Sequence, residues 1–455
     1  MSGAGGPTTV VLRSAYGGRN GFAHVASALS RAARVARIIL VEEDPSNLVA
    51  RLSESGRRVI VFYGVSTPLY LELAGEIERV SRIAPVVVGG PHASGAYWQV
   101  LRLGAVAAVV GDGEAAAPAI VESLSNDAAE WPPPNTAVYT GSSFRVGRTV
   151  LIDLDDYDPH YPQLGLYPPI EIMRGCSFRC RFCQVPWEFK SSVRFRGVES
   201  VARATVEYVR AGRRDIRFVA PIGLAYGSED LKTPNPSALE ELLRAVRDRG
   251  GRPYLGTFPS ETRPEFVTPE VLRVLKRLAH NRRISIGMQS GSDELLRFVG
   301  RGHGVEEAME AAATAVEFGF TPVVDLIFGM PGESEGDVEK TVEAMFKLAS
   351  MGARLRLHSF LPLVGTPLAR SRPKPIHPLY RKAVMRLLGR GVIEGYWREQ
   401  EELGKLMYCM TALDPAPTPE PKPLKGAVEY CSGVWRGMSV ARLDPYREIV
   451  ESLVQ

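Results

Sequence analysis

Short apolar runs alternate with segments of helical apolar spacing through residues 1–130. The runs are TVVLRS (9–14), ARIILV (36–41), RVIVFYG (58–64), PVVVGG (85–90) and AVAAVVG (105–111). Helix-like spacing occurs between them, as at 22–34, 69–82 and 113–125. Continuous apolar strands joined by helices are typical of a parallel sheet covered on both faces. The pattern therefore predicts five parallel strands in this region.

Five strands with such connections predict a flavodoxin-like domain. Small-residue turns follow three of the strands, in YGVSTP (63–68), VGGPHASG (88–95) and VGDGEAA (110–116). Open α/β sheets bind ligands outside the carboxyl ends of their strands, so these turns are candidate positions for a flat or phosphate-bearing cofactor. Glycines also suit tight turns that bind nothing, and the turns alone leave both interpretations open.

A second strand–helix series follows residues 131–167, a stretch rich in Pro, Asp, Tyr and Gly that predicts an irregular linker. Within 168–370, six apolar runs predict strands at 168–174, 215–221, 252–258, 283–289, 321–329 and 353–360. Six βα units are two short of a closed barrel, so we expect a partial (β/α)6 barrel with its chemistry at the carboxyl ends of the strands. Residues 371–455 predict a mostly helical C-terminal extension.

The composition is ordinary for a globular chain, with 45% hydrophobic and 23% charged residues and a net charge of +4. A charge this small does not imply a nucleic-acid partner, and no clustered basic patch is evident in the sequence. No run of about 18 or more apolar residues predicts a membrane span, and the first residues lack the pattern of a signal peptide. There are five cysteines, three of them close together. This usage fits a reducing cytoplasm better than a disulfide framework.

The three clustered cysteines, Cys176, Cys180 and Cys183, follow the first predicted barrel strand in RGCSFRCRFC. A structural zinc ion would need a fourth ligand such as His160, Cys409 or His303. A redox pair would use Cys180 and Cys183, and Cys176 would then have no role in it. A cubic iron–sulfur cluster normally takes four thiolates, so three would leave one iron with an open position.

The pattern C-x3-C-x2-C, with Phe182 before the last cysteine, resembles the signature of the radical S-adenosylmethionine (SAM) superfamily. The resemblance implies that the three cysteines hold a 4Fe–4S cluster and that the amino and carboxylate groups of SAM bind the fourth iron. It also implies that electron transfer cleaves SAM to a 5′-deoxyadenosyl radical. An electron donor such as ferredoxin or flavodoxin is then expected.

Segments after the later strands resemble the subgroup of that superfamily shared with methylthiotransferases and coproporphyrinogen dehydrogenase. These are IGMQSGSDELLRFVGRGH (286–303) and VDLIFGMPGES (324–334). The likeness implies that Gln289 faces the ribose of SAM, that Arg301 pairs with its carboxylate and that Asp325 lies near the cofactor. APIG (220–223) stands where the family often has Gly-Gly-Glu, so backbone carbonyls would receive the ammonium. The full expected SAM site comprises Phe182, Ala220, Pro221, Gly223, Thr257, Ser260, Gln289, Arg301 and Asp325.

A flavodoxin-like domain before such a barrel resembles the cobalamin-dependent class, and in layout the chain most resembles an archaeal group of these proteins with undefined substrate. The resemblance implies a cobalamin site lined by Ser66, Thr67, Gly89, Gly90, Gly111 and Glu114. The Asp-x-His-x-x-Gly motif that supplies a histidine ligand to cobalt in classical corrinoid domains is absent. His24 is present in the loop after the first strand without an Asp two residues earlier.

The function that the resemblance implies is methylation or another transformation of an unactivated carbon by a radical SAM enzyme, with an unassigned substrate. Two alternatives stay open: a radical enzyme that uses no corrinoid and keeps the first domain as a scaffold, and a non-catalytic corrinoid or iron–sulfur sensor. Cys409 and Cys431 are expected to be buried lone thiols. His303 and His358 could each be structural or donate a proton.

Overall fold

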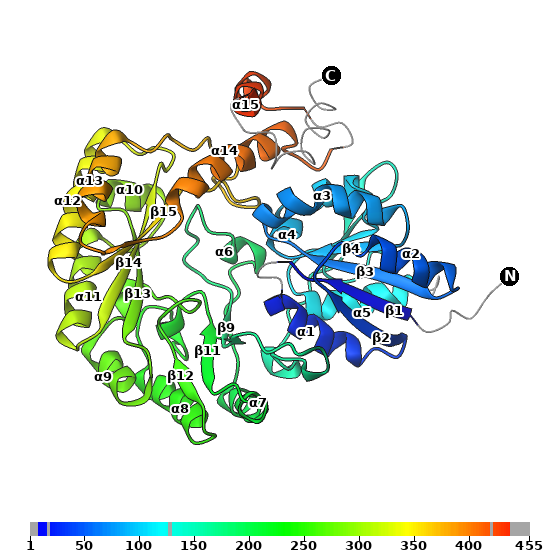
Figure 1. The fold of residues 1–455 in the computed structure, drawn as a ribbon, viewed down its shortest axis with the longest axis horizontal. Helices are drawn as coiled ribbons and strands as arrows, with labels where there is room; N and C mark the ends of the chain where they lie inside the picture. Colours follow the sequence, from blue (N-terminus) through cyan, green and yellow to red (C-terminus); the bar gives the residue numbers. More distant parts are fainter. Residues whose placement is uncertain (1–7, 16–18, 126–129, 419–421, 437–455) are drawn as a thin grey trace. The chain divides into compact units, whose positions relative to one another are not determined.

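The computed structural model describes residues 8–15, 19–125, 130–418 and 422–436, which form two compact units (Figure 1). Unit 1 comprises Met1–Pro168, Leu363–Arg370 and Leu406–Gln455, and unit 2 comprises Pro169–Pro362 and Ser371–Lys405. Among the described residues, no helix is long and apolar enough to cross a membrane. Residues 371–455, expected as a mostly helical C-terminal extension, are mostly helical where the structure describes them, and they divide between the two units.

Unit 1 contains the expected parallel sheet, with strands in the order β2-β1-β3-β4-β5. This order is that of flavodoxin-like folds and confirms the predicted fold class. The strands are β1 (Thr8–Arg13), β2 (Val35–Val41), β3 (Arg58–Gly64), β4 (Val86–Gly89) and β5 (Ala107–Val109). The helices are α1 (Arg19–Ser30), α2 (Ser46–Glu54), α3 (Thr67–Ser81), α4 (Pro91–Arg102) and α5 (Gly113–Ser123).

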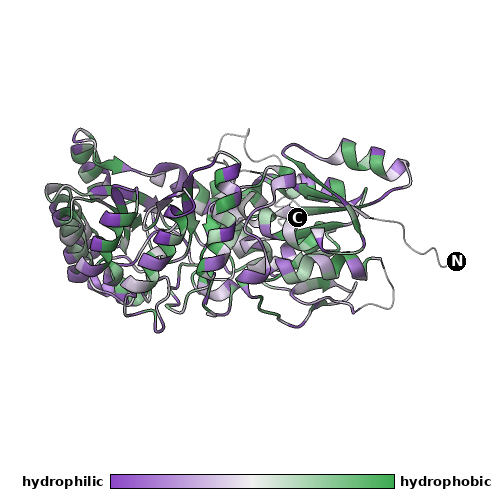
Figure 2. Ribbon diagram, turned by 90° about the horizontal axis from the view of Figure 1, so that it is seen from below, coloured by the Kyte–Doolittle hydropathy of each residue, from purple (hydrophilic) through white to green (hydrophobic). Residues whose placement is uncertain are grey.

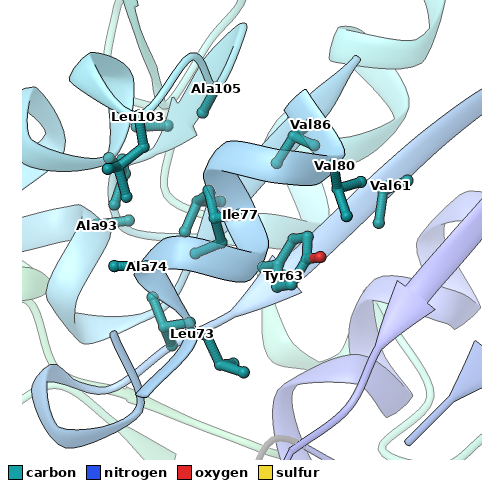
Figure 3. Close-up of a cluster of buried hydrophobic side chains, with 14 of the residues drawn as sticks. Val61, Tyr63, Leu73, Ala74, Ile77, Val80, Val86, Ala93, Leu103 and Ala105 are labelled. Carbon is teal, nitrogen blue, oxygen red and sulfur yellow. The ribbon is translucent and has the colours of Figure 1, made fainter. Parts of the chain in front are cut away.

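Side chains of the central strand β3 alternate between two apolar cores, one on each face of the sheet. Val61 and Tyr63 belong to the core that packs on α3 and α4, which Figure 3 shows from the side of α3. Ile60 and Phe62 belong to the opposite core, which α1 and α5 cover. Because both faces are buried, the strands are continuous apolar runs, and they are predominantly hydrophobic in Figure 2.

Residues 131–167 contain regular structure that their composition did not predict. Two strands, β6 (Thr136–Tyr139) and β7 (Phe144–Val146), add to β5 in antiparallel fashion. The buried Asn135 fixes the entry to β6, since its side chain donates to Val150 O at 2.7 Å and accepts from Val150 N at 2.7 Å. The physical reason for the hairpin is that β5 would otherwise expose an unpaired sheet edge.

The segments of unit 1 that come late in the chain pack on α4. Trp98 Nε1 donates to Asp414 O at 3.2 Å, and Gln99 Nε2 donates to the same oxygen at 3.0 Å. A Cβ at Gly95 would lie 2.6 Å from Val364 O, so the turn at 363–366 requires a glycine there. Unit 1 is thus assembled from three separate parts of the sequence.

Cys409 and Cys431 form a disulfide, so the prediction of two lone thiols is wrong. The bond joins α14 (Trp397–Leu413) to α15 (Ala427–Arg436), and the Cα atoms are 5.6 Å apart. This distance is ordinary for a disulfide. The two cysteines meet because α15 packs back on α14, and Leu424 N donates to Ala412 O at 2.8 Å. Their separation of 22 residues in the sequence does not show this contact. Cysteine usage no longer favours a reducing compartment, and the cytoplasmic location stays a prediction.

Unit 2 is the expected partial barrel. Its parallel strands form the groups β12-β11-β8 and β13-β14-β15-β16, and Thr262, in the segment after β12, forms a bridge with Ile286 of β13. The strands are β8 (Ile170–Glu171), β11 (Asp215–Val219), β12 (Arg252–Tyr254), β13 (Arg283–Gln289), β14 (Thr321–Phe328), β15 (Arg354–Ser359) and β16 (Ile393–Glu394). The helices between the strands are α7 (Val198–Arg210), α8 (Pro236–Arg247), α9 (Pro269–Leu278), α10 (Asp293–Phe298), α11 (Val305–Glu317), α12 (Glu335–Ser350) and α13 (Pro378–Leu388).

Two details of unit 2 differ from the strands predicted from the sequence. The first predicted strand breaks at Ile172 into β8 and β9 (Met173–Arg174), and β9 pairs with β10 (Arg194–Phe195) in a separate hairpin. The short β16 extends the sheet beyond β15, because residues after α13 return to pair with Leu355 and Arg356.

Basic side chains gather where three connecting segments lead into β11, β12 and β13. We call the segments 210–217, 244–252 and 276–283 the basic rim. The sequence analysis found no basic patch because each segment holds only four cations and the three lie far apart in the chain. The fold brings them together at the amino ends of neighbouring strands, which the separate segments of sequence do not show.

Candidate functional site

The three motif cysteines lie in a loop of unit 2 that follows β9. Gly175 starts the loop with φ +85°, and a Cβ there would lie 1.7 Å from Ser192 O. Cys176 and Cys180 are buried and Cys183 is partly buried, and all three are free thiols. Burial raises the pKa of Cys176 and raises that of Cys183 to about 12. Such thiols become thiolates when metal binding offsets the cost of a buried charge.

The segment after α10 holds this cysteine loop in place. Arg181 N donates to Val299 O at 2.9 Å, and Arg181 Nη1 donates to Phe298 O at 3.2 Å. The Arg181 guanidinium also lies over the Phe298 ring, 4.7 Å from its centroid. These contacts join the first βα turn of the barrel to the fourth. The sequence motif at 286–303 is therefore in contact with the cysteine motif.

Arg301 is the charged residue of this segment that approaches the cysteines. Its Nη1 lies 3.6 Å from Cys180 Sγ, its Nη2 donates to Gly287 O at 2.6 Å, and its Nε donates to His303 Nε2 at 2.9 Å. Arg263 Nη2 donates to Arg301 O at 2.7 Å, which fixes the backbone as well. The guanidinium is buried and pre-oriented, as recognition of a carboxylate requires.

His303 positions Arg301 as a neutral hydrogen-bond acceptor. Burial, and then the neighbouring Arg301 and Arg263, lower the pKa of His303 to about 3. Because Nε2 accepts from Arg301, the ring proton sits on Nδ1, which is 3.2 Å from Gly304 O. This arrangement favours a structural role for His303.

Gln289 and Arg301 converge over Gly287. A Cβ at Gly287 would lie 2.7 Å from both Arg301 Nη2 and Gln289 Nε2, so the ends of the two side chains meet over this glycine. Gln289 itself has φ +82°, an uncommon conformation for a residue with a side chain. Such strained positions cluster at ligand sites.

Asp325 projects from β14 as a buried carboxylate with one unsatisfied oxygen. Its Oδ1 has no hydrogen-bond partner among the described residues, although Arg356 Nη1 lies at 3.3 Å and His358 Nε2 at 3.7 Å. Arg356 also contacts Glu261 Oε1 at 3.3 Å and Ser285 Oγ at 3.2 Å. A buried acceptor without a partner is a position that a ligand hydroxyl would satisfy.

Sequence reasoning missed Arg356 and Glu261, which surround this carboxylate. Burial raises the pKa of Glu261. The available signal was the alternation in RLRLHS (354–359), where the intervening leucines are buried and Arg354, Arg356 and His358 lie on the other side of β15. An arginine in the middle of a barrel strand needs a buried anionic partner.

The expected residues at the second and third strand ends lie together. Gly223 N donates to Glu261 O at 2.7 Å, and a Cβ at Gly223 would lie 2.3 Å from Ser260 O. Ala220 N donates to Pro259 O at 3.4 Å. Pro221 lies between Ala220 and Gly223 in the sequence. The hydroxyl of the buried Ser260 donates to Thr257 O at 3.0 Å, so this donor is used inside its own turn. Phe182 is half-buried within the cysteine loop.

The donor set of the cysteine loop fits a cluster better than one ion. In the part of the chain that the structure describes, no three His, Cys, Asp or Glu side chains gather closely enough to hold a single metal ion. A cubic cluster takes each thiolate at a different iron, so its ligands need not converge on one point. Arg301 beside Cys180 supplies a cation next to the anionic thiolates.

The expected cobalamin residues of unit 1 form a set of adjoining turns. Gly90 has φ +96°, and a Cβ there would lie 2.7 Å from Val65 O, so this turn admits only glycine. Ser66 caps α3, and the buried Thr67 lies 3.4 Å from His92 Nδ1 through its hydroxyl. The turns after β3 and β4 join through Val65 N and Gly89 O, which are 2.8 Å apart.

The turn after β5 lies beside the other two. Gly111 has φ +87°, and its N–H donates to Ser94 Oγ at 3.1 Å. Glu114 is buried, with an oxygen 3.6 Å from His24 Nδ1. It therefore contacts His24 within unit 1. The absence of side chains at Gly89, Gly90 and Gly111 leaves backbone as the lining of this edge, which suits close approach of a flat macrocycle.

Comparison with known families matches two models to separate parts of the chain. A model of the radical SAM superfamily matches residues 170–345, and a model of the B12 binding domain matches residues 10–121. Each match falls within one of the two units, on the barrel and on the parallel sheet respectively.

Curated relatives are similar over part of their length. The uncharacterized protein MK0932 of Methanopyrus kandleri is 25% identical over 63% of this chain and 62% of its own length. The ribosomal protein uS12 methylthiotransferase RimO of Thermotoga petrophila is 28% identical over 38% of this chain and 40% of its own length. The chain thus spans less than two thirds of these relatives.

Solved structures share the fold over most of this chain. The radical S-adenosylmethionine methyltransferase TsrM from Kitasatospora setae, solved with cobalamin and a [4Fe-4S] cluster, has a TM-score of 0.61 at 17% identity and covers 81% of this chain and 76% of its own. The cobalamin-dependent radical enzyme OxsB, solved with aqua-cobalamin and S-adenosylmethionine, has a TM-score of 0.62 at 12% identity and covers 98% of this chain and 70% of its own.

Proposed function

We propose that this chain, which carries a radical SAM domain and a B12-binding domain, is a cobalamin-dependent radical SAM enzyme that methylates or otherwise transforms an unactivated carbon. The observation that carries the proposal is the fixed Arg301 guanidinium, 3.6 Å from Cys180 Sγ and beside Gln289. A carboxylate-binding cation next to a three-thiol loop is the arrangement that binding SAM at an open iron requires. The fold shared with TsrM and OxsB supports the same assignment.

In this proposal Cys176, Cys180 and Cys183 hold the 4Fe–4S cluster, and Arg301 binds the carboxylate of SAM. The ribose hydroxyls donate to Asp325, whose Oδ1 is unsatisfied in the described structure. When bound, the reduced cluster supplies the electron that cleaves SAM, and cobalamin supplies the methyl group. The turns at Gly89–Gly90 and Gly111 would hold the cobalamin.

The chain's own residues orient the reactants and hold charge. His303 accepts from Arg301 Nε and Gly287 O accepts from Nη2, so Nη1 is the remaining edge directed at the cysteine loop. The cation of Arg356 lies beside Asp325 and offsets its charge in the barrel interior. Such preorganised charges act strongly in a site from which water is excluded.

The proposal is tested with the full chain after anaerobic reconstitution with iron and sulfide. The reduced protein should convert SAM to 5′-deoxyadenosine, and protein mixed with hydroxocobalamin should retain a corrinoid spectrum after desalting. The Arg301→Lys variant should keep its iron and lose most of the cleavage, because a lysine ammonium lacks the planar group that His303 and Gly287 O hold so that Nη1 is directed at the cysteine loop. Absence of 5′-deoxyadenosine from iron-loaded wild-type protein would overturn the assignment, and absence of bound corrinoid alone would favour a radical enzyme without cobalamin.

Sulfur insertion of the methylthiotransferase type is not favoured by the sequence. Only two cysteines lie outside the motif, and in the structure they form the Cys409–Cys431 disulfide. A second cluster of the kind expected for sulfur insertion would require its own cysteine set. The similarity to RimO is therefore consistent with a shared barrel rather than a shared reaction.

A further inference from the structure

The basic rim concentrates positive charge in a chain that is otherwise nearly neutral. Its three segments, RAGRRDIR (210–217), RAVRDRGGR (244–252) and KRLAHNRR (276–283), contain 12 lysines and arginines against two aspartates. Their formal charge is +10, whereas the whole chain carries +4. The remaining residues together are thus net negative.

Hydrogen bonds connect the three segments. Arg252 N donates to Arg214 O at 2.7 Å, which joins the first segment to the second. Arg247 Nη1 donates to Arg277 O at 3.0 Å, which joins the second to the third. The helices that precede them, α7, α8 and α9, lie next to one another in unit 2 (Figure 1).

Ion pairs with nearby carboxylates reduce this charge and do not cancel it. The ion pairs recorded among the described residues link rim arginines to four carboxylates outside the segments: Glu199, Glu207, Glu240 and Glu394. Subtracting these four negative charges from +10 leaves a formal charge of +6 on the basic rim, which still exceeds the +4 of the whole chain. Arg214 and Arg282 are exposed and make no ion pair with the described residues.

The chemistry of the rim fits phosphodiester groups. Eleven of its 12 cations are arginines, whose planar guanidinium matches phosphate oxygens in a bidentate fork. Flat groups lie among them: Arg217 is over the Tyr254 ring, 5.0 Å from its centroid, and the exposed His280 is 6.2 Å from Tyr254. Rings beside arginines are typical of surfaces on which bases stack.

An acidic electron-transfer protein fits this surface less well. Such a protein must approach the cysteine loop, which contacts residues beyond the carboxyl end of β13. The rim is at the amino end of the same strand, and a seven-residue strand is roughly 20 Å long. We propose that the basic rim binds the phosphodiester backbone of a nucleic acid.

The test measures binding of the full chain by fluorescence anisotropy. The fluorescein-labelled probes are a single-stranded RNA of about 20 nucleotides, DNA of the same sequence and the corresponding RNA duplex. Each is titrated at KCl concentrations between about 50 and 200 mM. If about four phosphates are contacted, the affinity for single strands falls with a log–log salt slope of about −3. The three probes distinguish the nucleic-acid source. Absence of RNA and DNA binding at the lowest salt overturns the proposal.

The variant Arg214→Glu/Arg282→Glu should weaken binding at least about tenfold and make the salt slope shallower by about 1.4, because two phosphate contacts are lost. The control Arg57→Glu/Arg58→Glu changes the charge equally at exposed positions of unit 1 and should leave the affinity within about twofold. Equal weakening by both variants, or equally tight binding of polyglutamate by the wild type, would overturn the proposal. Iron content after reconstitution serves as the check that both variants are folded.

Discussion

The buried carboxyl of Glu333 gives unit 2 a stability that depends on pH. Glu333 lies in the turn between β14 and α12, where Tyr380 Oη donates to Oε1 at 2.8 Å and Gly329 N donates to Oε2 at 3.1 Å. Burial raises the pKa of this carboxyl to about 7 from an ordinary value of 4.5, and the two hydrogen bonds oppose only part of that rise. The fold therefore favours the protonated, neutral form.

The sign and size of the effect follow from the difference between the folded and unfolded pKa values. The folded-state pKa is the higher one, so the contribution is fully present below about pH 4.5 and is lost as the pH rises through about 7. A difference of about 2.5 units corresponds to about 3 kcal/mol of unfolding free energy, as an upper value. The Glu333→Gln variant keeps a neutral side chain of the same shape and removes this dependence.

The assay is urea unfolding of the cluster-free protein at several pH values between about 5 and 8, followed by tryptophan fluorescence. Trp397 packs in the same apolar core as Tyr380 and reports on this region. The variant's stability relative to wild type should rise by about 2–3 kcal/mol across this range, since the wild type alone must ionise a buried group. The exposed Glu339→Gln change on α12 is the control and should give a flat difference.

A parallel pH dependence of Glu333→Gln and wild type would refute the reasoning. It would mean that the carboxyl is charged in the fold, with Tyr380 and Gly329 outweighing burial. Tyr380→Phe separates these contributions, because loss of its hydroxyl removes one donor and should raise the pKa of Glu333 further.

Four further results are expected. Cys180→Ala should abolish the brown absorbance and the iron content of reconstituted protein, and retention of either would contradict its assignment as a ligand. His303→Phe should weaken SAM binding by equilibrium dialysis at least about tenfold with unchanged iron, because a buried Arg301 donor loses its partner, and His303→Gln should restore part of the affinity. Gly90→Ala should lower the melting temperature and prevent corrinoid retention, since φ +96° and Val65 O at 2.7 Å exclude a side chain. Cys409→Ser should lower the unfolding free energy by about 3 kcal/mol for a closed loop of this length, unless the thiols are reduced in the purified protein.

The predictable parts of the structure are those that local patterns specify. β1 and β3 are continuous apolar runs because both faces of their sheet are buried, and this pattern cannot be mistaken for a half-exposed strand. The cysteine loop was located for a related reason, since it immediately follows a strand. Its neighbour Arg301 was assigned by resemblance, and the structure places it 3.6 Å from Cys180 Sγ.

The parts that were missed depend on contacts between distant segments. Nothing near Arg356 in the sequence shows that Asp325 and Glu261 lie on either side of it. The partners of Cys409 and of the edge strand β5 are likewise set by how the chain returns. The basic rim was missed for the same reason, since its charge comes from three distant segments. Each segment alone resembles an ordinary helix end with cations in the last turn.

The division of unit 1 among three stretches of sequence has a consequence for how the protein is made. Residues 363–370 and 406–436 are synthesised only after nearly all of unit 2, yet they cover α4 of unit 1. Asp414 and the turn at Val364 therefore reach Trp98 and Gly95 last. Unit 1 therefore cannot acquire the segments that cover α4 until most of unit 2 has been synthesised. A fragment ending near residue 168 would lack those contacts, so unit 1 keeps its full packing on α4 only when the later segments are expressed with it.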